Sequence, residues 1–105
     1  MVVTFEEAYL QELYVKGATN DKKHRFQPDI VRRYQKCIQL IKSVPDITSL
    51  SKYNSLNYEV LKGDKKGISS IRVNEKYRIE FTVKDSLEEP IVTVCNIIDL
   101  SNHYK

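Results

Sequence analysis

Residues 69–83 have the sequence SSIRVNEKYRIEFTV, in which apolar and polar side chains alternate on both sides of a short polar interruption. The apolar positions are Ile71 and Val73 before the interruption, then Tyr77, Ile79, Phe81 and Val83 after it. Alternation with a period of two is typical of a strand with one buried face. The stretch therefore predicts two antiparallel strands joined by a three-residue turn at 74–76.

The polar positions of this hairpin predict its register. If Arg72 and Arg78 both avoid the core, Val73 pairs with Tyr77 and the two arginines stand opposite each other on one face. Like charges directly across a strand pair are unfavourable, so the pair indicates an anion between or above them, and guanidinium groups match phosphate well. Glu80, diagonal to Arg72, offers the alternative of a solvated ladder of ion pairs. Residue types alone do not separate the two interpretations.

Two helices are expected before this hairpin. Thr4 and Glu7 have the spacing of a capping box, which predicts a helix over residues 4–16 that Gly17 ends. Residues 18–27 are polar and basic and are interpreted as a loop. A second helix begins at Pro28, shows helical apolar spacing through Val44 and is stopped by Pro45.

The remaining segments complete the predicted architecture. Residues 85–90 form a loop, and residues 91–98 are more continuously apolar than the hairpin, as in a strand covered on both faces. Residues 1–3 are a possible edge strand. The fold class is therefore α+β, with two N-terminal helices packed on an antiparallel β-meander.

Composition limits the class of protein. The length of 105 residues favours one domain over residues 1–105, and 41% hydrophobic with 30% charged residues excludes collagenous and broadly disordered chains. No apolar run approaches the roughly 18 residues of a membrane span, and no leader is evident, so we expect a cytoplasmic protein. Cys37 and Cys95 lie far apart in apolar contexts, which favours reduced core thiols without a metal site.

Positive charge is concentrated in two parts of the chain. The net charge is only +3, but residues 21–45 carry +5 and residues 62–84 carry +4. Within the second part, Gly63 and Gly67 bracket a basic turn that contains Lys65 and Lys66. The turn is interpreted either as a solvated hairpin or as a segment that leans over the arginine face, which Lys62 could join. The spacing of a P-loop is absent.

Both histidines have two interpretations. His103 with Tyr104 is either an exposed tail or a proton-transfer group beside an aromatic ring that stacks on a base or binds phosphate. His24 lies among Lys22, Lys23 and Arg25, where a solvated basic loop is the first interpretation and contact with an RNA backbone the second.

Four pieces of the sequence are distinctive in combination: LKGDKKG at 61–67, SIRVN at 70–74, YRIEF at 77–81 and NHY at 102–104. Together they resemble the HigB branch of the RelE/ParE toxin superfamily, and the order of helices and strands over the whole chain agrees with that fold. Some relatives carry a further histidine near the start of the meander. This chain has Asn57-Tyr58-Glu59 there, and Tyr58 or Glu59 is the candidate to take its place.

The resemblance implies the toxin of a type II toxin-antitoxin module, which cleaves mRNA on the ribosome without a metal or other cofactor. A 2′-hydroxyl would attack the adjacent phosphate, Arg72, Arg78 and Lys62 would stabilise the developing charge, and His103 would transfer a proton. Lys65, Lys66, Tyr58 and Tyr104 would bind substrate. The implied partners are the ribosome, mRNA and an antitoxin that is itself a helix-turn-helix DNA-binding protein. Alternatives are a non-catalytic toxin of this fold that inhibits a protein such as gyrase, and a degenerate toxin that only binds its antitoxin.

Overall fold

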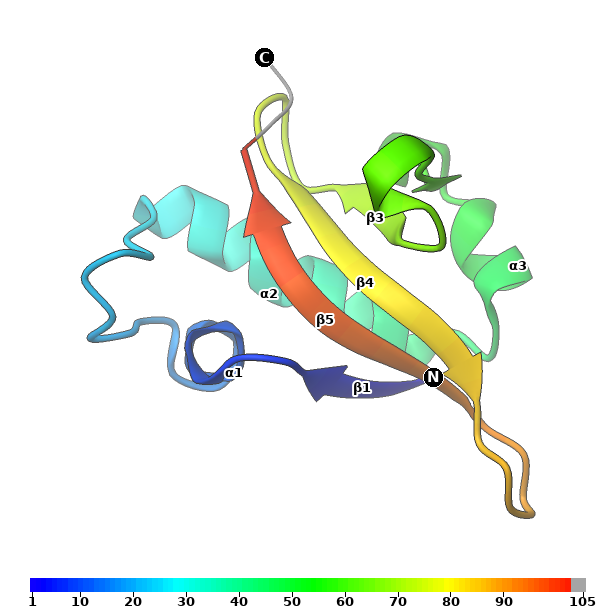
Figure 1. Cartoon of the computed structure of the whole chain (residues 1–105). Coiled ribbons are helices and arrows are strands. Elements are labelled where there is room, and N and C mark those ends of the chain that lie inside the picture. The colour runs from blue at the N-terminus through cyan, green and yellow to red at the C-terminus, as the bar shows by residue number, and fades with distance from the viewer. Residues whose placement is uncertain (103–105) are drawn as a thin grey trace.

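Five strands form one sheet in the order β1-β5-β4-β3-β2, and the computed structural model describes residues 1–102 (Figure 1). The strands are β1 (Val2–Phe5), β2 (Glu59–Val60), β3 (Ser69–Arg72), β4 (Arg78–Asp85) and β5 (Thr93–Ser101). The helices are α1 (Ala8–Lys16), α2 (Pro28–Ser43) and α3 (Ile47–Ser51), with short 3-10 turns η1 (Asn54–Leu56) and η2 (Gly63–Lys65). The α+β fold class is confirmed.

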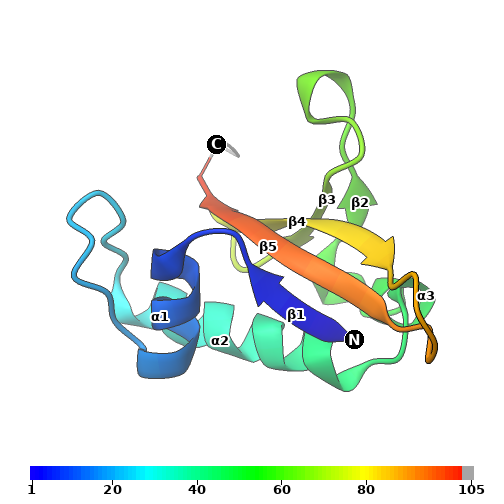
Figure 2. The ribbon, with the colours of Figure 1, turned by 60° about the horizontal axis from the view of Figure 1, so that its bottom comes forward.

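The long strand β5 lies inside the sheet, between β1 and β4. It pairs antiparallel with β4 on one side and parallel with β1 on the other, where Val2 lies opposite Val94. The first strand of the chain therefore completes the edge next to the last strand. Since β1 is short, α1 follows it along the same edge of β5 (Figure 2).

The apolar core lies between the helices and one face of the sheet. Helix α2 runs across this face, behind the sheet in Figure 1 and below it in Figure 2. The fully buried core side chains are Leu10, Tyr34, Ile38 and Ile41 from the helices, Leu50 from α3, and Ile71, Ile79, Phe81, Cys95 and Ile97 from the sheet. Burying such a side chain stabilises a fold by about 1.5–3 kcal/mol, so these alternating positions hold the sheet against α2.

The hairpin of β3 and β4 has the predicted register. Arg72 lies opposite Arg78, and the amide of Val73 donates to the carbonyl oxygen of Tyr77 at 2.9 Å. The side-chain oxygen of Asn74 accepts from the amides of Lys76 and Tyr77, at 2.9 and 2.8 Å, and so fastens the turn. The start of α2 at Pro28 and the end of α1 at Gly17, with φ +73°, also agree with the sequence.

The predicted start of the first helix is wrong. Thr4 lies in β1, where its hydroxyl donates to Asn96 Oδ1 at 2.9 Å, and α1 begins only at Ala8. Glu7 precedes the helix without a capping hydrogen bond from its side chain. The physical reason is that residues 2–5 pair in parallel register with residues 94–97 of β5, and this strand pairing outweighs a local capping box. The possible edge strand at residues 1–3 is thereby confirmed.

The last strand also differs from its prediction. It runs from Thr93 to Ser101, whereas Ile91 and Val92 lie outside it and are exposed. Pairing between β4 and β5 ends at Asp85 and Thr93, so the residues between them form a projecting loop with no neighbouring strand. The strand has neighbours on both sides, β1 and β4, but five of its nine residues are only half-buried, so it is not covered on both faces as predicted.

Both thiols are buried and unpaired, as expected. Burial raises the pKa of Cys37 and of Cys95 to about 11 each. Within residues 1–102, no helix is long and apolar enough to cross a bilayer.

Candidate functional site

The functional residues predicted in the hairpin lie on the face of the sheet opposite α2, which is turned to the viewer in Figure 1. We call the part of this face that carries Ser70, Arg72, Arg78 and Glu80 the polar face. The sequence alternation predicted solvent-exposed side chains here, and for two of them this is wrong: Arg78 is 8% exposed and Glu80 is 2% exposed. The reason is that the turn around η2, which rises from the sheet on the side away from α2 (Figure 2), contacts Glu80 through Lys65, and the backbone carbonyl of Asn57 contacts Arg78.

Arg78 is held in one orientation by neighbouring groups. Its Nε donates to Ser70 Oγ at 3.0 Å, and its Nη2 donates to the carbonyl oxygen of Asn57 at 2.5 Å. The Glu59 carboxylate lies 3.7 Å from the same Nη2. The guanidinium is therefore fixed before any ligand arrives.

Asn57 contributes to this arrangement through its backbone. It has φ +44° and ψ +52°, the left-handed conformation that asparagine tolerates better than most residues. The conformation turns the chain from η1 into β2 and lets its carbonyl meet Arg78. Asn57 was not among the predicted site residues; an asparagine just before a strand is the only sequence signal for its role.

Arg72 is in register with Arg78 but has different surroundings. It is partly exposed, and its Nε donates to the carbonyl oxygen of Asn74 at 3.2 Å. Its guanidinium group therefore reaches around the end of β3 toward the turn. The predicted arginine pair thus consists of one fixed, buried member and one accessible member.

The basic turn around η2 does lean over the polar face. The amide of Leu61 donates to the carbonyl oxygen of Ile68 at 2.8 Å and closes the base of the turn. Lys65 Nζ then contacts both carboxylate oxygens of Glu80, at 2.8 and 3.0 Å. Lys62 and Lys66 are exposed on the same turn. Lys65 therefore anchors the turn to the sheet, and Glu80 binds Lys65 instead of being part of a solvated ladder.

Tyr58 lies on the other side of the sheet. Its hydroxyl is hydrogen-bonded to Ser69 Oγ at 2.9 Å, and its ring centroid lies 6.4 Å from that of Phe81. Ser69 and Phe81 are paired in register and share the face that packs on the helices. The structure therefore does not bring Tyr58 together with the arginine pair.

The two C-terminal candidates, His103 and Tyr104, lie outside the described residues. The described part of β5 ends beside the site, because Ser101 lies opposite Arg78 in the pairing of β4 with β5.

His24 is more ordered than a solvated loop residue. Its ring stacks on Tyr9, with centroids 3.6 Å apart and an interplanar angle of 4°, and its Nδ1 lies 3.1 Å from Asp21 Oδ2. Tyr9 in turn donates to Asp99 Oδ1 at 3.3 Å. Burial, and then the Asp99 carboxylate, raise the pKa of Tyr9 above its usual value. These contacts tie the loop between α1 and α2 to the end of β5.

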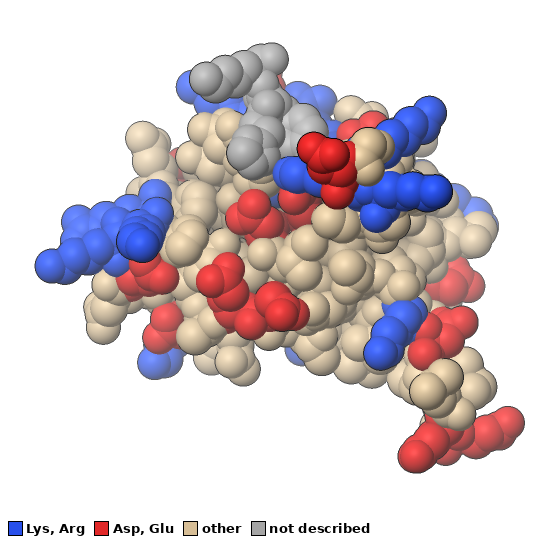
Figure 3. Space-filling model, viewed as in Figure 1, with Lys and Arg blue, Asp and Glu red and all other residues tan. Residues whose placement is uncertain are grey.

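Charges of both signs share the viewed side of the molecule (Figure 3). Basic side chains gather over the loop before α2 and near the turn that contains η2, and acidic side chains lie between them. In residues 1–102, no group of three or more histidine, cysteine, aspartate or glutamate side chains is arranged to hold a metal ion.

Comparison with models of protein families identifies the family of this chain. Residues 3–94 match the model of HigB-like toxins, described as the RelE-like toxin of the type II toxin-antitoxin system HigB. The chain belongs to the HigB-like toxin family. Membership of this family implies an antitoxin as partner. A search of curated protein sequences finds no match.

Solved structures agree with a HigB-like toxin fold. A YoeB/ParE toxin from Agrobacterium tumefaciens is 20% identical with a TM-score of 0.58, and the alignment covers 99% of this chain and 100% of that one. The YoeB dimer from Staphylococcus aureus is 22% identical with a TM-score of 0.52, covering 99% and 98%. At such identities the likeness supports the fold alone.

Proposed function

We propose that this HigB-like toxin is a ribosome-dependent mRNA endoribonuclease. In the proposed reaction the 2′-hydroxyl of a nucleotide loses its proton and attacks the adjacent phosphate. The bond to the 5′-oxygen of the next nucleotide breaks, and that oxygen accepts a proton. The products are a cyclic phosphate and a 5′-hydroxyl, and no metal or other cofactor takes part.

The observation that carries the proposal is the in-register arginine pair with its fixed member. Charge accumulates on the phosphoryl oxygens in the transition state, and a cation that is already oriented stabilises it without reorganisation. Arg78 meets this requirement, since Ser70 and Asn57 hold its guanidinium. Arg72 is the accessible partner that can close on the phosphate.

The remaining candidates receive roles consistent with their positions. Lys62 and Lys66 are exposed on the turn above the polar face and would draw the RNA backbone toward it. Lys65 would keep the turn in place through Glu80. From the family resemblance, His103 is the proton-transfer group and Tyr104 the group that stacks on or orients the substrate.

Induced expression with mapping of mRNA ends tests the proposal. We expect new 5′ ends within translated messages for the natural chain, and their loss for Arg72→Ala and for His103→Ala. Both variants should still fold and bind the antitoxin. Arg32→Ala, an exposed arginine on the far side of α2, is the matched control and should cleave normally.

Other outcomes would redirect the assignment. Growth arrest without new mRNA ends, accompanied by stalled replication, would favour a toxin that inhibits a protein such as gyrase. A protein that binds its antitoxin but causes no arrest would be a degenerate toxin. If Arg72→Ala and His103→Ala both remain fully toxic, the site is elsewhere.

A further inference from the structure

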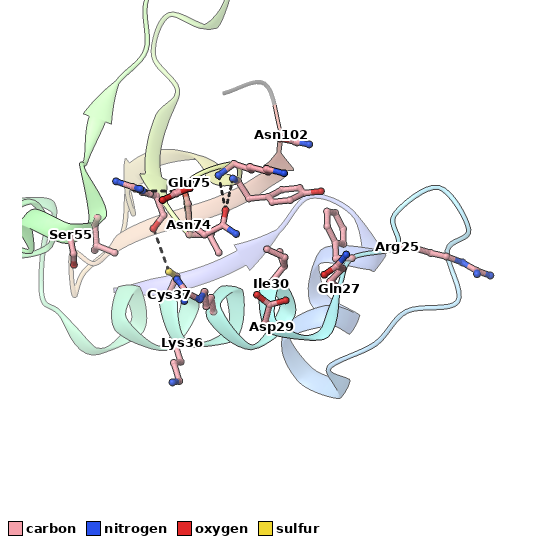
Figure 4. A pocket seen from close by; sticks show the side chains of 17 residues that line it. Arg25, Gln27, Asp29, Ile30, Lys36, Cys37, Ser55, Asn74, Glu75 and Asn102 are labelled. Carbon is pink, nitrogen blue, oxygen red and sulfur yellow. Dashed lines mark hydrogen bonds between the residues drawn. The ribbon is translucent and has the colours of Figure 1, made fainter. Parts of the chain in front are cut away.

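A second basic region lies beside the polar face: an open pocket of 1070 Å³ between α2 and the turn that joins β3 to β4 (Figure 4). We call it the turn pocket. Cationic side chains outnumber acidic ones in its lining, with Arg25, Arg33, Lys36, Arg72 and Lys76 against Asp29 and Glu75. Arg25 and Lys36 point away from the interior of the pocket in Figure 4, so their charges lie at its margin. The excess charge makes the pocket a site for an anion.

The uncharged residues that line the pocket indicate which class of anion it binds. Phe26 and Tyr77 pack edge to face across the pocket wall, with centroids 5.5 Å apart, and both are partly exposed. Side-chain amides of Gln27, Asn74 and Asn102 also line it. Cations combined with aromatic rings and amides are typical of surfaces that bind single-stranded nucleic acid, where phosphates meet the cations and bases meet the rings.

The pocket is continuous with the polar face through one residue. Arg72 lines the turn pocket and is also the register partner of Arg78. A strand of RNA whose phosphate lies at the arginine pair would therefore continue, over the end of β3, into the pocket. An acidic peptide would also satisfy the charges, but it would not use the aromatic wall or the continuity with the arginine pair.

We propose that the turn pocket binds the phosphodiester backbone of single-stranded RNA next to the phosphate held by the arginine pair. The proposal rests on the ribonuclease function, because that function places RNA at Arg72. It assigns a role to the positive charge of the segment 21–45, which the reaction itself does not use.

Two adjacent arginines on α2 provide a matched test. Arg33 lines the turn pocket, whereas Arg32 is also exposed but lines a separate groove near α1. We therefore compare Arg33→Glu with Arg32→Glu. The probe is a short fluorescent RNA oligonucleotide with 2′-O-methyl groups, which cannot be cleaved by 2′-hydroxyl attack, and its binding is followed by anisotropy over a range of salt concentrations.

We expect Arg33→Glu to weaken binding about ten-fold at low salt and to reduce the slope of log affinity against log salt by about 0.7, the value for one lost phosphate contact with a single strand. Arg32→Glu should bind like the natural chain. Lys76→Glu, on the opposite wall, should repeat the loss. In translation reactions, Arg33→Glu should raise the mRNA concentration needed for half-maximal cleavage more than it lowers the maximal rate.

The outcomes separate this proposal from the ribonuclease function. Equal RNA binding by Arg33→Glu and Arg32→Glu would overturn it even if the natural chain cleaves mRNA. Loss of antitoxin binding in Arg33→Glu with RNA binding intact would overturn it in favour of an acidic protein segment. If RNA binding falls as expected but the natural chain produces no cuts, the pocket assignment stands and the ribonuclease function fails.

Discussion

The two faces of the sheet are stabilised by different kinds of interaction. The face that packs on α2 is dry and apolar, with Ile71, Ile79 and Phe81 fully buried. The polar face also buries side chains, but they are Ser70, Arg78 and Glu80. They are covered by the turn around η2 and by the backbone at Asn57, which contact them through a few directed hydrogen bonds.

The difference separates stability from function. Non-directional burial over many side chains holds the helix face, so a substitution there changes the free energy of unfolding first. A small number of polar contacts determines the geometry of the polar face, so substitutions there change the orientation of the arginines. Substitutions on the two faces should therefore differ in what they change.

Removing a large side chain from the face that packs on α2 should cause the largest loss in the free energy of unfolding. Phe81→Ala deletes a fully buried ring, and we expect a loss of about 4 kcal/mol in the free energy of unfolding, measured by urea titration. Thr82→Ala, the exposed neighbour on β4, should change it by less than about 0.5 kcal/mol. Similar losses for the two variants would contradict the assignment of the apolar face.

The paired arginines should differ in stability although they share one face. Arg78→Ala removes the donors to Ser70 Oγ and to the Asn57 carbonyl, and we expect a loss of about 2–3 kcal/mol. Arg72→Ala should cost less than about 0.5 kcal/mol because its side chain is partly exposed. Thermal unfolding and mRNA cleavage should be measured together. Both variants should lose cleavage, and equal destabilisation would show that Arg78 is not fixed as described.

The anchor of the basic turn should have an intermediate effect. Lys65→Ala removes a partly exposed ammonium from the buried Glu80 carboxylate, and we expect a loss of about 1.5 kcal/mol, smaller at high salt. Lys66→Ala, next to it and exposed, should leave stability unchanged. Chemical denaturation at two salt concentrations measures both. A salt-independent loss would argue against the ion pair.

Substitution of Tyr58 should cause the smallest loss of stability in this series, and it should affect stability without affecting mRNA cleavage. Tyr58→Phe removes only the hydroxyl that bonds Ser69 Oγ, so we expect a loss of about 0.5–1 kcal/mol with mRNA cleavage unchanged. If cleavage falls while stability does not, Tyr58 serves the substrate as the sequence suggested. Ser69→Ala, which removes the other partner, should match Tyr58→Phe in stability.

The sequence predicted those helices and strands in which apolar residues recur at regular spacing. The alternation from Ile71 to Val83 gave both strands of the hairpin, and the parity of Arg72 and Arg78 gave their register. Helix α2 has both a start signal at Pro28 and regular apolar spacing. These features are local, so no knowledge of the rest of the chain is needed to see them.

Features that depend on distant partners were missed. Thr4 has the local pattern of a helix cap, but it lies in a strand because it pairs with β5. Arg78 and Glu80 alternate like exposed residues, yet a segment without any periodic pattern covers them. Tyr58 neighbours the candidate site in sequence but faces the core. In each case a tertiary contact decides the outcome, and composition carries no trace of it.

The parallel pairing of β1 with β5 has a consequence for the order of synthesis. Val2 and Val94 are partners although they are 92 positions apart in the sequence, so the first strand made has no neighbour until β5 is made. Closing so long a loop is a late and slow step of folding. Arg78, opposite Ser101, likewise gains its β5 neighbour only then. The chain thus cannot complete its own sheet while a ribosome is still adding β5.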